Sequence, residues 1–143
     1  MLVQQIDSLT AYEMLKNNKN SILIDVRTTE EFDLVGIVDA NSFNNRMILL
    51  PWQSYHDGQQ NPDFLVILEN KIKIFFKENT SIISLIFICR SGVRSNYSAN
   101  YLANLGYKNC YNISDGFEGK INSNNQRSMI NGWKYNKLPW RQK

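Results

Sequence analysis

Apolar positions along the chain occur in short runs separated by segments with helical spacing, and this alternation is typical of an α/β protein. Residues 21–27 and 82–88 form the two clearest runs, which are rich in β-branched side chains and end at charged or reactive residues. Such runs are typical of strands buried in a parallel sheet. Shorter runs at 3–6, 46–50 and 107–113 predict three further strands. The pattern therefore predicts a central, mainly parallel sheet.

Helical spacing connects these runs in four places, at residues 8–17, 28–36, 62–77 and 93–105. Thr28 and Glu31 have the spacing of a capping box, which begins a helix by satisfying free N–H groups. Pro62 suits the first position of the third helix, and Leu105 is expected to face inward in the fourth. Because helices connect successive parallel strands, we expect helices on both faces of the sheet.

The chain has 143 residues, which is enough for one domain with a sizeable core. The regular pattern ends near residue 119, so the core is placed at about 2–119. Residues 120–143 form a polar loop and then a tail, in which Trp133 and Trp140 are expected to pack on the body. The whole chain, 1–143, is therefore predicted to be a single domain.

Charge is concentrated at the end of the chain. The net charge is +3, but four positive charges belong to Lys134, Lys137, Arg141 and Lys143. The rest is close to neutral, which argues against a nucleic-acid-binding surface. No stretch approaches the roughly 18 apolar residues of a membrane span, and the first residues lack the features of a signal peptide. We therefore expect a cytoplasmic protein with no nucleic-acid or membrane partner.

A reactive cysteine is predicted where the 82–88 strand meets the following helix. The connecting loop, CRSGVRS, consists of Cys89, Arg90, Ser91, Gly92, Val93, Arg94 and Ser95. A side chain at the carboxyl end of a parallel strand lies in the crevice where open α/β sheets bind ligands. Loop N–H groups, a helix N-terminus and nearby arginines favour a thiolate in such a place. Cys89 is therefore the candidate nucleophile, and residues 90–95 form the candidate anion-binding loop.

Two charged residues are expected to support this loop. Asp25 and Arg27 end the 21–27 strand at the same sheet edge as Cys89, where they could form ion pairs or hydrogen bonds. The second cysteine, Cys110, lies in an apolar run, which is typical of an inert core thiol.

The polar loop at 52–62 is a second candidate for lining a pocket. Trp52, Tyr55 and His56 lie in it, although packing is the simpler role for Trp52. Because His56 is the only histidine, a Cys-His dyad would have to use this loop. No cluster of cysteine and histidine residues fits a metal site, and no cofactor is predicted.

Four motifs together resemble the rhodanese (sulfurtransferase) domain of the bacterial single-domain type, over about residues 2–140. They are IDVR at 24–27, the E-E-F helix start at 30–32, CRSGVRS at 89–95 and DGFEG at 115–119. The resemblance implies an α/β domain in which Cys89 carries sulfur as a persulfide and residues 90–94 cradle an anion. It also implies that Asp25 and Arg27 match the family's structural acid and base.

The chain departs from the family pattern in two loops. GIVDAN at 36–41 stands where members often have GHIPGA, and Asp115-Gly116 stands where they often have a Gly-Gly pair. Neither departure touches the nucleophile, so both concern local loop shape.

The resemblance implies transfer of a sulfane sulfur from a donor such as thiosulfate to a thiol or cyanide acceptor. A persulfide carrier that hands sulfur to a relay protein would use the same residues. A silent partner-binding module is another alternative, although silent members commonly lose the cysteine. A cysteine phosphatase or arsenate reductase is less favoured, because these resemble Cys-x5-Arg. Here Arg94 completes Cys-x4-Arg, and the sixth position is Ser95.

Overall fold

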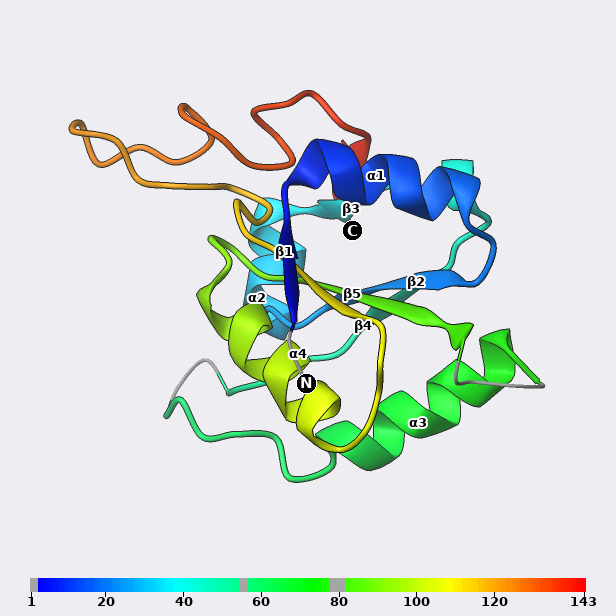
Figure 1. The fold of residues 1–143 in the computed structure, drawn as a ribbon. Coiled ribbons are helices and arrows are strands. Elements are labelled where there is room, and N and C mark those ends of the chain that lie inside the picture. Colours follow the sequence, from blue (N-terminus) through cyan, green and yellow to red (C-terminus); the bar gives the residue numbers. More distant parts are fainter. Residues whose placement is uncertain (1–2, 55–56, 78–81) are drawn as a thin grey trace.

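Five parallel strands form the central sheet, in the order β1-β6-β5-β2-β4 (Figure 1). The computed structural model describes residues 3–54, 57–77 and 82–143. The strands of this sheet are β1 (Gln4–Ile6), β2 (Ser21–Asp25), β4 (Met47–Leu49), β5 (Ser84–Ile88) and β6 (Cys110–Ile113). In the register of the two central strands, Asp25 of β2 lies opposite Ile88 of β5. The predicted parallel sheet is confirmed, and the segments that follow β2 and β5 leave it at one edge.

Four helices flank the sheet: α1 (Ser8–Asn17), α2 (Thr29–Val35), α3 (Phe64–Phe75) and α4 (Val93–Asn104). Figure 1 shows α1 on one side of the sheet and both α3 and α4 on the other. This confirms the predicted α/β class with helices on both faces. In the described part of the chain, no helix combines the length and apolarity needed to cross a membrane.

Alternation along the strands divides the apolar interior into two cores. On β5, Leu85 and Phe87 join the core under α3 and α4, whereas Ile86 and Ile88 join the core under α1. Both cores contain side chains that are fully or almost fully buried. Because successive strand residues point to opposite faces, Cys89 continues the row of Leu85 and Phe87. The sulfur is therefore directed toward the α4 side of the sheet.

Two sequence expectations about the helices are wrong. Pro62 does not begin α3, because the helix starts at Phe64 and Asp63 is its N-cap residue. Leu105 is half exposed instead of inward, since α4 ends at Asn104 and Leu105 is its C-cap. The apolar stripe of a helix covers about 100°, and Leu105 falls outside the stripe that contains Ala99.

The C-terminal segment crosses the molecule on the same side as α1 (Figure 1). Trp133 is completely buried, its Nε1 donates to the Pro139 carbonyl at 2.8 Å, and its ring meets the Tyr12 ring edge to face. Two short strands, β3 (Ile37–Val38) and β7 (Trp140–Arg141), then pair antiparallel. A short 3-10 helix, η1 (Asn41–Phe43), follows β3. Trp133 therefore anchors residues 120–143 to the body.

Replacing Trp133 with Ala should lower the free energy of unfolding by about 3–5 kcal/mol, because it leaves a large cavity in the core. Urea denaturation followed by circular dichroism measures this loss. Tyr135→Ala is the matched control, since Tyr135 is another aromatic residue of the tail but is half exposed. Equal unfolding midpoints for the two variants would show that the tail does not depend on Trp133.

Candidate active site

Cys89 lies directly after β5, beneath the first turn of α4. Its side chain is buried, its Sγ accepts a hydrogen bond from Gly92 N at 3.2 Å, and Ser95 Oγ lies within hydrogen-bonding distance of Sγ, also at 3.2 Å. The first intrahelical hydrogen bond of α4 runs from Asn96 N to Gly92 O. The N–H groups of the helix's first three residues therefore have no acceptor within the helix. The positive end of the helix lies beside the sulfur, an arrangement that stabilises negative charge.

The turn at 114–119 holds the loop at 89–95 from behind. Phe117 N donates to Cys89 O at 2.8 Å, and Glu118 N and Gly119 N both donate to Arg90 O. These hydrogen bonds occupy loop carbonyl groups and leave loop N–H groups for the sulfur side. The DGFEG motif at 115–119 therefore lies in a turn that supports the cysteine loop.

Two glycines permit this close backbone contact. Gly92 has a φ of 98°, and a Cβ there would overlap the backbone of Ser114. Gly116 has a φ of 65°, and a Cβ there would overlap the backbone of Arg90. A positive φ is strained for residues other than glycine, so both positions need glycine for conformation and for space.

Asn112 connects the cysteine loop to β1. It is buried in β6, and its Nδ2 donates to Gly92 O at 3.1 Å and to Gln5 Oε1 at 2.7 Å. Its Oδ1 accepts from Ser95 Oγ at 2.5 Å. Sequence analysis missed both Asn112 and Gln5. The available signal was a polar side chain inside the apolar run at 107–113.

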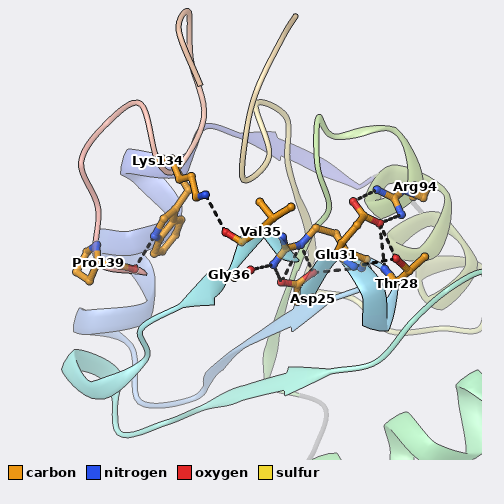
Figure 2. A network of polar contacts seen from close by, with 10 residues as sticks. Asp25, Thr28, Glu31, Val35, Gly36, Arg94, Lys134 and Pro139 are labelled. Carbon is orange, nitrogen blue, oxygen red and sulfur yellow. Dashed lines mark hydrogen bonds and ion pairs between the residues drawn. The ribbon is translucent and has the colours of Figure 1, made fainter. Parts of the chain in front are cut away.

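Arg94 forms a bidentate ion pair with Glu31 across the gap between α4 and α2 (Figure 2). The two N–O distances are 2.6 and 2.9 Å, and Glu31 also accepts from the N and Oγ1 of Thr28 in the predicted capping box. Burial raises the pKa of Glu31, but the hydrogen bonds from Arg94 and Thr28 outweigh this and lower it to about 2. The pair with Glu31 raises the pKa of Arg94. The charge of Arg94 is therefore matched by a carboxylate, which the sequence did not predict.

Asp25 and Arg27 pair with each other beneath the site, and both side chains are fully buried. Arg27 Nη2 lies 2.7 Å from Asp25 Oδ2 and also donates to Gly36 O at 2.9 Å (Figure 2). The Arg27 guanidinium stands 4.2 Å from the centre of the Phe117 ring. Its Nη1 has no hydrogen-bond partner among the described residues. Phe117 in turn donates its N–H to Cys89 O, so the pair reaches the cysteine loop indirectly, through Phe117.

A hollow of about 310 Å³ opens beside the loop. Its lining residues are Thr28, Glu31, Gln53, Ser54, Gly58, Arg90 and Arg94. Arg90 is exposed, and no carboxylate of the described residues forms an ion pair with it. Tyr55 and His56, which were candidates for a pocket lining, lie outside the described residues. Trp52 is buried against the Phe64 ring.

Cys110 does not share this environment. It is buried, its Sγ donates to Tyr107 O at 3.6 Å, and burial raises its pKa to about 11. Its register partner is Leu85, four residues before Cys89, which separates the cysteines by about 13 Å along the strands. A disulfide needs Cα atoms within about 7 Å. Cys110 is therefore too far away to resolve a persulfide on Cys89.

The described residues contain no group of three His, Cys, Asp or Glu side chains that could hold a metal ion. The groups that the site presents are the Cys89 sulfur, the loop N–H groups and the charged side chains around the hollow.

In a Cys89→Ser variant, the remaining thiol of Cys110 should react slowly with iodoacetamide at neutral pH. Reaction should accelerate as the pH approaches about 11, because the thiolate is the reactive form and burial raises the Cys110 pKa to that value. Mass spectrometry over a pH series measures the rate, with the urea-unfolded variant as control. Equal rates for the folded and unfolded forms at neutral pH would contradict the prediction.

Gly92→Ala should destabilise the fold by roughly 3–4 kcal/mol, since it combines a strained φ with a backbone overlap. Gly106→Ala is the matched control, because Gly106 has a φ of 105° but nothing within 4 Å of an added Cβ. The control should lose only about 1–2 kcal/mol. Urea unfolding compares the two, and equal losses would show that the loop does not need the close contact.

Comparison with known proteins places this site in a family. The STR4 middle domain family matches residues 4–143. An uncharacterised protein of Rickettsia rickettsii is 48% identical over 140 residues, covering 98% of this chain and 98% of its own. The thiosulfate sulfurtransferase GlpE of Actinobacillus succinogenes is 29% identical over 119 residues, covering 83% of this chain and 85% of its own.

The crystal structure of Rv0390 from M. tuberculosis superimposes with a TM-score of 0.85 and 34% identity, covering all of both chains. A match over nearly the whole chain, in sequence and in fold, shows the family. This chain belongs to the STR4 middle domain family and has a single rhodanese-like domain fold.

Proposed function

We propose that this protein is a sulfurtransferase that carries sulfur as a persulfide on Cys89. A small donor such as thiosulfate supplies the sulfane sulfur, and a thiol or cyanide accepts it. The observation that carries the proposal is the position of the Cys89 sulfur at the start of α4, where Gly92 N donates to it and Ser95 Oγ lies within hydrogen-bonding distance. The similarity to GlpE, a thiosulfate sulfurtransferase, supports the same reaction.

Transfer takes place in two displacements. In the first, the Cys89 thiolate attacks the outer sulfur of thiosulfate, the S–S bond of the donor breaks, and sulfite leaves with the bonding electrons. The terminal sulfur of the new persulfide carries the negative charge about 2 Å beyond Sγ. The free N–H groups in the first turn of α4 are placed to stabilise it there. In the second, an acceptor thiolate attacks the terminal sulfur and the Cys89 thiolate is regenerated.

The same residues would serve a persulfide carrier whose acceptor is a relay protein, and this form of the proposal differs only in the second displacement. Phosphatase chemistry is less well supported. The arginine that would hold a phosphoryl group, Arg94, donates from both of its Nη atoms to Glu31. Gly92 N also lies within hydrogen-bond distance of Sγ itself, which fits a ring around one sulfur atom.

Cys89→Ser should abolish sulfur transfer and leave the unfolding midpoint nearly unchanged, because a hydroxyl is similar in size but far less nucleophilic. Cys110→Ser is the matched control and should keep most of the activity, since Cys110 lies far from the loop. Intact-protein mass spectrometry after incubation with thiosulfate should show one added sulfur on the natural protein and none on Cys89→Ser. Loss of the added sulfur in Cys110→Ser alone would reverse the assignment.

A further inference from the structure

The hollow beside the cysteine loop contains a carboxylate as well as two arginines. Glu31 lines the hollow together with Arg90 and Arg94, and its side chain is 16% exposed. An anion that enters the hollow therefore meets two positive charges and one negative charge. Arg94 is already paired with the negative charge of Glu31, and Arg90 has no ion-pair partner among the described carboxylates.

The geometry of the ion pair decides what Arg94 can offer. A guanidinium binds an oxyanion best through two parallel N–H donors. In Arg94, Nη1 and Nη2 both point at Glu31, at 2.6 and 2.9 Å. The Nη1–Nη2 edge of the Arg94 guanidinium is thus occupied by Glu31.

Glu31 is also fixed in place. Its Oε1 accepts from the backbone N and from the Oγ1 of Thr28, both at 3.1 Å, so movement away from Arg94 would break the cap of α2. With a pKa of about 2, the carboxylate stays ionised at neutral pH. Its negative charge is a permanent part of the hollow.

We propose that Glu31 is a specificity-determining residue that occupies Arg94 and shifts the preference of the site away from dianionic thiosulfate toward monoanionic sulfur donors. This inference rests on the proposed sulfur transfer. The favoured class contains thiosulfonates and persulfides, whose reacting group carries a single negative charge. The Glu31 carboxylate repels each negative charge of the donor. This repulsion therefore raises the binding free energy of a dianion about twice as much as that of a monoanion.

Two probe donors that share the same scissile S–S bond differ in this charge. With benzenethiosulfonate, the Cys89 thiolate attacks the terminal sulfur, the S–S bond breaks, and benzenesulfinate leaves with the bonding electrons. With thiosulfate, the same bond type breaks and sulfite leaves. The persulfide on Cys89 is the same in both reactions, so a change in the ratio of the two donor rates reports on how the site binds each donor.

Glu31→Gln is the test variant, because glutamine at this helix position also completes a capping box but carries no charge. Asp33→Asn is the matched control. It removes one negative charge from the same helix, at a side chain that is 59% exposed and lies 3.5 Å from Lys143. Charges that are exposed to solvent are strongly screened.

In Glu31→Gln, kcat/KM for thiosulfate should rise about tenfold more than kcat/KM for benzenethiosulfonate, from the removal of one nearby charge. In Asp33→Asn, the ratio of the two constants should change by less than about twofold. An equal change for both donors in Glu31→Gln would overturn the inference, because it would show that Glu31 acts only on loop structure.

Alkylation provides a readout that does not depend on sulfur transfer. Iodoacetate carries a negative charge and iodoacetamide does not, and their rate ratio at Cys89 cancels any change in the fraction of thiolate. This ratio should rise several-fold in Glu31→Gln and stay constant in Asp33→Asn, by the same removal of one charge. A constant ratio in both variants would overturn the inference. If the alkylation ratio rises but neither donor transfers sulfur, the proposed function is rejected, whereas the effect of Glu31 on anions stands.

Discussion

The close backbone contact between the loop at 89–95 and the turn at 114–119 is the constraint on which the site depends. It requires glycine at positions 92 and 116, and it turns the carbonyls of Cys89 and Arg90 toward the turn. Asp115 extends the constraint, because its carboxylate accepts from Ser8 N and Ser8 Oγ and from the N of Gly132. The start of α1, the C-terminal segment and the cysteine loop are thereby held by one short turn.

Charged side chains join the elements that leave the sheet at its carboxyl edge. The buried pair of Asp25 and Arg27 carries a desolvation penalty, which the bond to Gly36 O and the Phe117 ring partly offset. Higher in the site, Arg94 joins α4 to α2 through Glu31. The Asp25–Arg27 pair is fully buried, whereas the Glu31–Arg94 pair is partly exposed. Only the Glu31–Arg94 pair can therefore act on a molecule that enters the hollow.

Local signals in the sequence were sufficient for much of the fold. The capping box of Thr28 and Glu31 predicted the start of α2, and β-branched runs predicted the central strands, because these features depend on neighbouring residues. Pairing of β3 with β7 was not predictable, since two short segments about 100 residues apart have no common local pattern. The same reason applies to Glu31 and Arg94. Both were named from motifs, but their contact depends on how α2 and α4 pack.

The hydrogen bonds around Ser95 show why the loop backbone is a more constant donor to the Cys89 sulfur than any single side chain. The Ser95 hydroxyl has one proton and two acceptors in reach, Cys89 Sγ and Asn112 Oδ1. Asn112 cannot offer an N–H to Ser95 instead, because its Nδ2 is held by Gly92 O and by Gln5. Ser95 therefore donates to only one of its acceptors at a time, whereas Gly92 N–H can donate to the sulfur in every state. The constant donor comes from the loop conformation, and that conformation depends on the two glycines at its contact with the turn.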